Sequence, residues 1–261
     1  MTAENPSEPP PTVHLAGESN DGEAILRQLV GGLQEIVQFH QDVVGDAWAI
    51  AGSLTGLHAD VLGRLSRAIG NDWSDAEQGV LLLGSHAFNV FTAAVGATCR
   101  GEFDTIQYLT RAAHDAASLV TVCAISDSHS ERWLRGELKA SEARRDFVQV
   151  LSDAGHVDEA ADLDKLLREE AEAANVAAHL GPLHADRLIR KDEDGVLWPT
   201  IGGRSDSRLA LRQIEMSLAL EITTLSPLLS SFVQPSEPSE LDRFTELHER
   251  LRVWRSELLE R

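Results

Sequence analysis

The sequence predicts an all-α fold, a helical bundle of about six or seven helices with a small β-hairpin insertion. Apolar residues recur at helical spacing along most of the chain. Residues 79–99 contain no Asp, Glu, Lys or Arg, and a second apolar segment ends at Ile125. Because 25% of all residues are charged, two neighbouring helices this apolar are expected at the centre of the bundle.

The composition fits one large helical domain. The chain has 261 residues, and 43% of them are hydrophobic, which is enough for a sizeable core. Its formal net charge is -19, and a surface this acidic repels phosphate backbones. We therefore expect no nucleic-acid partner, although the 23 Lys and Arg residues leave room for a local basic patch.

The first 21 residues are expected to form a disordered acidic tail. They include four prolines and four acidic residues but no Lys or Arg, a composition that cannot bury a core. The pattern of a signal peptide is missing, so we expect a cytoplasmic protein. Residues 79–99 have the length of a membrane span, but polar residues such as Ser85 and Asn89 dilute them. A buried core helix is the better interpretation, and no membrane association is expected.

The next elements are two helices, or one kinked helix, over residues 23–68, where glycines interrupt the helical pattern. Capping boxes then mark two helix starts. One is formed by Ser74 with Glu77, and the other by Ser128 with Glu131. Between them, the polar pair Arg100-Gly101 predicts the turn that joins the two apolar helices.

The second half of the chain begins with a candidate C-cap at Gly155, before a helix expected over residues 158–180. Residues 185–203 break the helical rhythm, and Asp192-Glu193-Asp194-Gly195 reads as the turn of a β-hairpin flap. Helix resumes near Ser207, and a Pro-containing linker precedes a last helix. The predicted units are the tail 1–21, the bundle domain 22–233, and the linker with the C-terminal helix, 234–261.

The last helix carries an apolar stripe, Leu247, Leu251, Trp254 and Leu258. This stripe is expected to pack on its own bundle. The alternative is a short seam between two subunits, because the linker would let the helix swing out. A homodimer therefore stays open.

The two cysteines are not expected to pair within one subunit. Cys99 lies beside the predicted turn, and Cys123 lies about 20 residues beyond it, on the order of 30 Å along a helix. A disulfide needs Cα atoms within about 7 Å. Both thiols are interpreted as buried apolar groups in a reducing compartment.

Polar residues on the two apolar helices are the candidate site. Asp104, Arg111 and Asp115 share one helical face, so the Arg can form charge-assisted bonds to both carboxylates. One interpretation is that these three residues form a solvated polar face. The other is that they line a pocket or hold two helices together. On the preceding helix, Asn89 and the neighbouring His86 either satisfy other core groups or belong to a shared ligand pocket.

Two histidines near the predicted end of helix 158–180 are candidates for proton transfer. His179 closes this helix, where the macrodipole favours a cationic ring, and His184 follows after Gly181-Pro182. If the protein is an enzyme, either ring carries a proton or contacts phosphate near Arg111. No two His lie four apart on one helix and no Glu-x-x-His pair occurs within a helix, so no metal or cofactor is expected.

One stretch resembles a known family. Arg100-Gly101, the segment 109–115 (LTRAAHD) and the segment 131–136 (ERWLRG) are similar to motifs of a group of uncharacterised bacterial helical proteins, which looks related to the HEPN superfamily (higher eukaryotes and prokaryotes nucleotide-binding). The resemblance implies a helical bundle, a dimer, and a role in stress response or phage defence. It also makes Arg100 a candidate binding residue.

HEPN ribonucleases resemble one another in an Arg followed a few residues later by His. Here the nearest Arg before His179 is Arg168, 11 residues away, so the resemblance does not imply cleavage. The leading hypothesis is a non-enzymatic cytoplasmic protein that acts through binding or assembly, with a second copy or another protein as partner. One alternative is a metal-independent ribonuclease, with Arg111 stabilising the phosphorane charge and His179 or His184 moving protons. The other is a small-molecule-binding helical domain.

Overall fold

The computed structural model describes most of residues 22–259. The described parts are residues 22–70, 73–153 and 206–259, the short segments 189–191 and 197–199, and single residues or pairs between 155 and 168. The predicted tail 1–21 and the second half of the predicted helix 158–180 lie outside the described residues.

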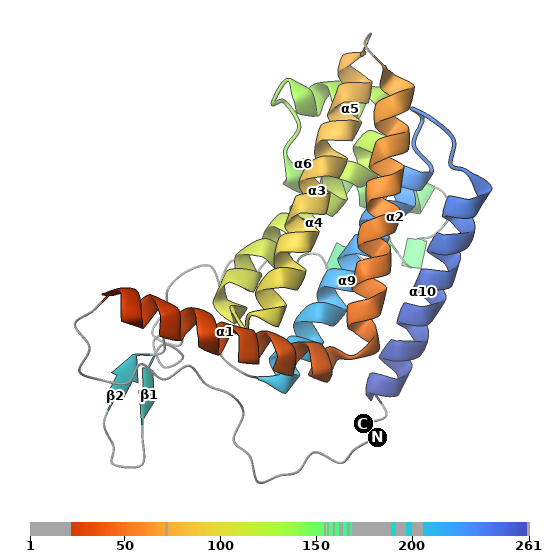
Figure 1. Ribbon diagram of the computed structural model, residues 1–261. Coiled ribbons are helices and arrows are strands. Elements are labelled where there is room, and N and C mark those ends of the chain that lie inside the picture. The colour runs from red at the N-terminus through yellow and green to blue at the C-terminus, as the bar shows by residue number, and fades with distance from the viewer. Residues whose placement is uncertain are drawn as a thin grey trace.

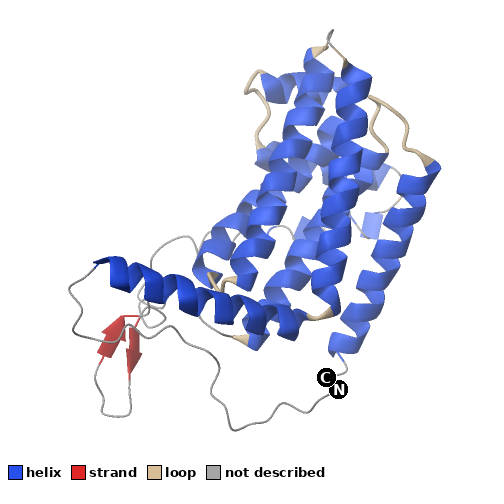
Figure 2. Ribbon diagram, in the orientation of Figure 1, coloured by secondary structure: helices blue, strands red, loops and turns tan. Residues whose placement is uncertain are grey.

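The fold class is all-α, as predicted, and eight helices occur in the described part of the chain (Figures 1 and 2). Their bounds are α1 Gly22–Val44, α2 Asp46–Ile69, α3 Asp75–Cys99, α4 Phe103–Ile125, α5 Asp127–Leu134, α6 Ala140–Asp153, α9 Ser207–Leu229 and α10 Pro238–Leu259. In Figure 1, α2, α3, α4, α9 and α10 run along the bundle, and α1 crosses its lower end. Helix α3 packs on α4, α5 and α9, and α10 lies along α2.

The two apolar helices contribute much of the core, together with a third. In α3, 13 of 25 residues are buried, although this helix is also long and apolar enough to cross a membrane by length and composition. Helix α4 packs on both α3 and α9. Helix α9 was not singled out from the sequence, yet its Ile214, Leu218 and Leu225 are completely buried. The centre of the bundle is therefore a packing of α3, α4 and α9.

Most predicted boundaries are confirmed. Gly45 takes a φ of 51° between α1 and α2, a conformation that glycine adopts at little cost, so the first segment is two helices. Ser74 and Glu77 form the full capping box of α3. The turn between α3 and α4 falls at Arg100-Gly101, where Gly101 has a φ of 68°.

The second predicted capping box is wrong. Helix α5 begins at Asp127 with Ser126 as its N-cap, so it starts earlier than a cap at Ser128 would allow. The backbone closes the first turn on Ser126, whose carbonyl accepts the Ser130 N–H at 3.2 Å. Ser130 is buried against α3 and donates a hydrogen bond to the Ala76 carbonyl at 2.5 Å.

Two short strands lie in the described residues, β1 Ile189–Lys191 and β2 Leu197–Pro199, which pair antiparallel with Arg190 opposite Trp198. The residues that would form the turn and join these strands to the bundle lie outside the described residues. The prediction of a hairpin insertion that acts as a flap therefore stays a prediction.

The C-terminal helix is docked on its own bundle. Leu247 and Leu251 are buried in the core. At the start of α10, the buried Arg64 of α2 donates to Glu240 at 2.8 Å and to the Gln234 carbonyl at 2.6 Å. These contacts fix the linker as well as the helix. Leu247 and Leu251 therefore pack on their own bundle, whereas Trp254 and Leu258 are only partly buried, and the homodimer stays a prediction.

Both cysteines are buried and free. Burial raises the pKa of Cys99 to about 11 and that of Cys123 to about 12, so neither holds a thiolate near neutral pH. We expect a thiol-specific reagent such as Ellman's reagent to label neither cysteine in the folded protein and both in denaturing guanidinium. Rapid labelling of either thiol in the folded protein would contradict their placement in the core.

Candidate functional site

The predicted cluster on α4 exists, but its geometry differs from the prediction. Arg111 donates from Nε to Asp115 Oδ2 at 3.0 Å, and the two side chains are 29% and 30% exposed. A second guanidinium approaches the same carboxylate, because Arg144 of α6 places Nη2 3.8 Å from Asp115 Oδ1. The side chain of Asp104 lies outside the described part. In the described contacts, one carboxylate therefore lies between two arginines and joins α4 to α6.

The other predicted residues are not brought to this cluster. His86 and Asn89 lie exposed on α3. Arg100 pairs with Glu102 across the turn at 2.7 Å, and this hydrogen bond raises the pKa of Arg100. His179 and His184 lie outside the described residues. Of the predicted site, the described structure joins only Arg111 and Asp115.

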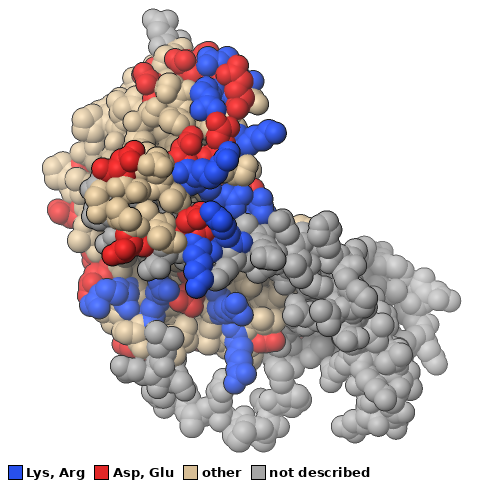
Figure 3. Space-filling view, turned by 180° about the vertical axis from the view of Figure 1, so that it is seen from behind, with Lys and Arg blue, Asp and Glu red and all other residues tan. Residues whose placement is uncertain are grey.

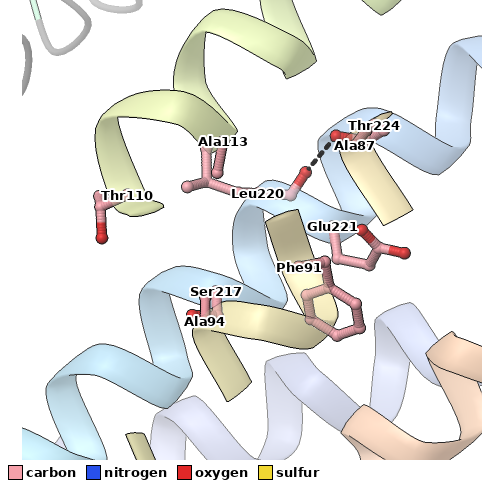
Figure 4. Close-up of a pocket in the computed structure, with 9 residues that line it drawn as sticks. All are labelled: Ala87, Phe91, Ala94, Thr110, Ala113, Ser217, Leu220, Glu221 and Thr224. Carbon is pink, nitrogen blue, oxygen red and sulfur yellow. Dashed lines mark hydrogen bonds between the residues drawn. The ribbon is translucent and has the colours of Figure 1, made fainter. Parts of the chain in front are cut away.

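The enclosed space in the core lies elsewhere, between α3, α4 and α9 (Figure 4). It has room for about one water molecule. None of the predicted binding residues with a described side chain lines it. Its lining residues are Ala87, Phe91, Ala94, Thr110, Ala113, Ser217, Leu220, Glu221 and Thr224. A space this small does not hold a metabolite in this conformation.

Glu221, the ionisable residue of this lining, forms a buried pair with His58 of α2. The carboxylate Oε1 lies 2.5 Å from His58 Nδ1, and the side chains are 1% and 0% exposed. Burial raises the pKa of Glu221, and the hydrogen bond from His58 lowers it in part. The His58 ring also packs edge-on against Phe88. The pair can hold a proton between ring and carboxylate, and it links α2 to α9 through the core.

Sequence reasoning missed both members of this pair, although a signal for each is visible. His58 sits among the apolar positions Leu54, Leu57 and Val61 of α2. Glu221 occurs seven residues after Ile214, on the buried stripe of α9. An ionisable residue at a core position of a helix needs a partner, but the sequence does not say which helix supplies it.

A third histidine, His40, holds three elements together. Its ring is completely buried. It donates from Nδ1 to the Cys99 carbonyl at the end of α3, 2.9 Å away, and accepts at Nε2 from the backbone N–H of Asp206 at the start of α9, 3.2 Å away. This arrangement requires the neutral ring. Burial is the largest influence and lowers the pKa of His40, while the Cys99 carbonyl and the Asp206 charge oppose it.

This contact predicts an acid-sensitive stability. Because the pKa of His40 is lower in the folded protein than in the unfolded chain, its contribution is complete above about pH 6.5 and is lost as the pH falls below that value. One such group changes the free energy of unfolding by at most about 1.4 kcal/mol per pH unit. We expect urea unfolding of the wild type to weaken more between pH 7 and pH 5 than that of His40→Gln. Parallel curves for the two proteins would contradict this role.

One hollow lies at the surface, beside the junction of α1 and α2. The residues that line it include Asp42, Asp46, Trp254 and Glu257. Of the predicted site residues whose side chains the structure describes, none lines this hollow. It is larger than the space beside Glu221.

Comparison of the chain with protein-family models, curated proteins and solved structures gives no match. The HEPN-like motifs around Arg111 therefore have no support beyond the sequence pattern itself, and the assignment stays a prediction.

Proposed function

We propose that this protein acts through binding, by assembling with another protein, rather than by catalysis. One observation carries the proposal: three of the large apolar side chains that are exposed in the described part of the chain lie at one end of the bundle, while Arg111 of the candidate site is paired with Asp115. The exposed fractions are 48% for Trp73, 46% for Ile125 and 43% for Phe232. Exposed apolar surface of this kind is typical of a protein interface.

The charge distribution bears on the ribonuclease alternative. In Figure 3, Lys and Arg side chains form a column down the described part of this face, and Asp and Glu side chains lie among them, mainly toward its top. Arg111 is already engaged by Asp115. The ribonuclease alternative needs an open basic site beside His179 or His184, and both histidines lie outside the described residues. That alternative remains a hypothesis without support from the described geometry.

The cellular setting is part of the proposal and rests on the HEPN-like motifs alone. It is a cytoplasmic role connected with stress response or phage defence. The partner is a protein rather than a nucleic acid, because a net charge of -19 opposes a phosphate backbone.

Affinity capture of the full chain from its host cells, followed by native mass spectrometry, tests the proposal. We expect a complex of defined stoichiometry, either with another protein or with a second copy. A free monomer that carries no protein under mild crosslinking would contradict it. Loss of RNA integrity that depends on Arg111 would favour the ribonuclease instead.

The small-molecule alternative has one feature in its favour, the hollow beside Trp254. Carboxylates and an indole ring are groups that hold an organic cation. Thermal-shift measurements with a polyamine, compared with a dicarboxylate, would test this second function. A shift with the polyamine that is lost in Trp254→Leu would support it, and equal curves with and without polyamine would reject it.

A further inference from the structure

Three exposed apolar side chains lie at the same end of the bundle. Phe232, just after α9, donates its backbone N–H to the Ala124 carbonyl at 3.2 Å, which places it beside Ile125 at the end of α4. Helix α5 follows Ile125 directly, and its Ser130 bonds the Ala76 carbonyl in the first turn of α3. Trp73 lies just before that turn. Figure 1 shows the α2–α3 connection and the α4–α5 junction at the same end of the bundle. We call Trp73, Ile125 and Phe232 the apolar end.

The helix ends around the apolar end carry charges of both signs. Asp75 and Asp127 are exposed in the first turns of α3 and α5, where they face the positive dipole ends of these helices. Helices α4 and α9 finish at this surface without a basic residue in their own last turns. The last turns of α2 and α5 contribute Arg67 and Arg132. The two exposed aspartates, on a chain with a formal net charge of -19, favour a ligand that is apolar and cationic.

We propose that the apolar end docks a basic amphipathic helix of a partner protein, with the apolar side chains of that helix on Trp73, Ile125 and Phe232 and its Lys or Arg near Asp75 and Asp127. This inference rests on the proposed function and names the partner's chemistry. Helix-on-surface recognition uses an apolar stripe for affinity, while complementary charge sets orientation and association rate.

A second copy of this chain fits the surface less well. Each chain carries a formal net charge of -19, and the same negative groups would face one another across a symmetric contact. Like charges across an interface are unfavourable. A basic segment removes that repulsion and adds attraction.

The test uses the full chain and a fluorescent helical peptide of Leu and Lys, with Leu on one face. Control peptides replace every Lys by Glu or scatter the same residues so that no apolar face forms. The test protein is the double variant Ile125→Ser/Phe232→Ser, and Trp73→Ser is a second variant in case the first fails to fold. Val253→Ser is the matched control, because Val253 is an apolar residue exposed to a similar degree, 42%, on α10.

Fluorescence anisotropy is expected to show binding of the Leu/Lys peptide alone. The double variant or Trp73→Ser should bind it at least about tenfold more weakly, since a few buried apolar anchors dominate such affinities. Val253→Ser should bind like the wild type, and Asp75→Asn/Asp127→Asn should reduce the dependence of affinity on salt. Equal affinity of the wild type and the folded apolar-end variants would overturn the proposal, and so would equal binding of the Leu/Glu peptide.

Failure of this inference is distinguishable from failure of the proposed function. A partner captured from host cells equally well by the wild type and by Ile125→Ser/Phe232→Ser would leave the proposed function standing. It would overturn the assignment of the apolar end and its ligand.

Discussion

Replacing Glu221 with Ala is expected to lower the free energy of unfolding by about 3–5 kcal/mol, the usual cost of leaving one member of a buried pair without its partner. His58 would then keep both ring nitrogens in the core, since its Nε2 already has no hydrogen-bond partner in the described structure and Nδ1 would lose the carboxylate. Urea unfolding followed by circular dichroism measures this loss.

Two further variants show whether the loss of stability comes from breaking the buried pair itself. Glu215→Ala, on the same helix, removes a half-exposed ion pair with Arg255, and we expect a cost below about 1 kcal/mol. The double replacement His58→Leu/Glu221→Leu removes both polar groups, so it should cost clearly less than Glu221→Ala alone. A Glu221→Ala protein as stable as Glu215→Ala would contradict the burial of the pair.

Gly79→Ala is expected to destabilise the protein by about 1–3 kcal/mol, the typical cost of overpacking. A methyl group at this position would lie 2.2 Å from Ser130 Oγ and 2.9 Å from the Ser130 carbonyl oxygen. Backbone cannot move aside as a flexible side chain does, so α5 would be pushed away from α3. The hydrogen bond from Ser130 to Ala76 would be strained as well.

Gly52→Ala is the matched control for this prediction. Gly52 also lies within a helix, but a methyl group there meets nothing within 4 Å. Alanine should therefore stabilise α2 by about 0.5–1 kcal/mol through its higher helix propensity. Thermal or urea unfolding of both variants gives the comparison, and a Gly79→Ala protein that gains stability as Gly52→Ala does would show that α5 does not pack closely on α3.

Much of the fold could be predicted because its determinants are local. The capping box of Ser74, the glycine at position 45 and the turn at Arg100-Gly101 act over a few residues. The helical spacing of apolar residues predicted most of the helices, and the absence of charged residues indicated that α3 is a core helix. The start of α5 was misplaced because Ser126 and Ser128 are both residues suited to an N-cap, and the backbone closes its first turn on Ser126.

The candidate site was harder to predict because its partners are far apart in sequence. Arg111 and Asp115 are four residues apart, so their pairing follows from helix geometry. Arg144 comes from another helix, and His58 is 163 residues from Glu221. Periodicity can show that a residue is buried, but it cannot show which helix lies opposite.

The central claim is that this protein works through its exposed apolar end rather than through the charged cluster on α4. Affinity capture from host cells with two double variants tests it directly. The account predicts that Arg111→Ala/Asp115→Ala retains the partner protein and that Ile125→Ser/Phe232→Ser loses it. The reverse outcome, loss of the partner in the charge variant and retention in the apolar-end variant, would contradict the account.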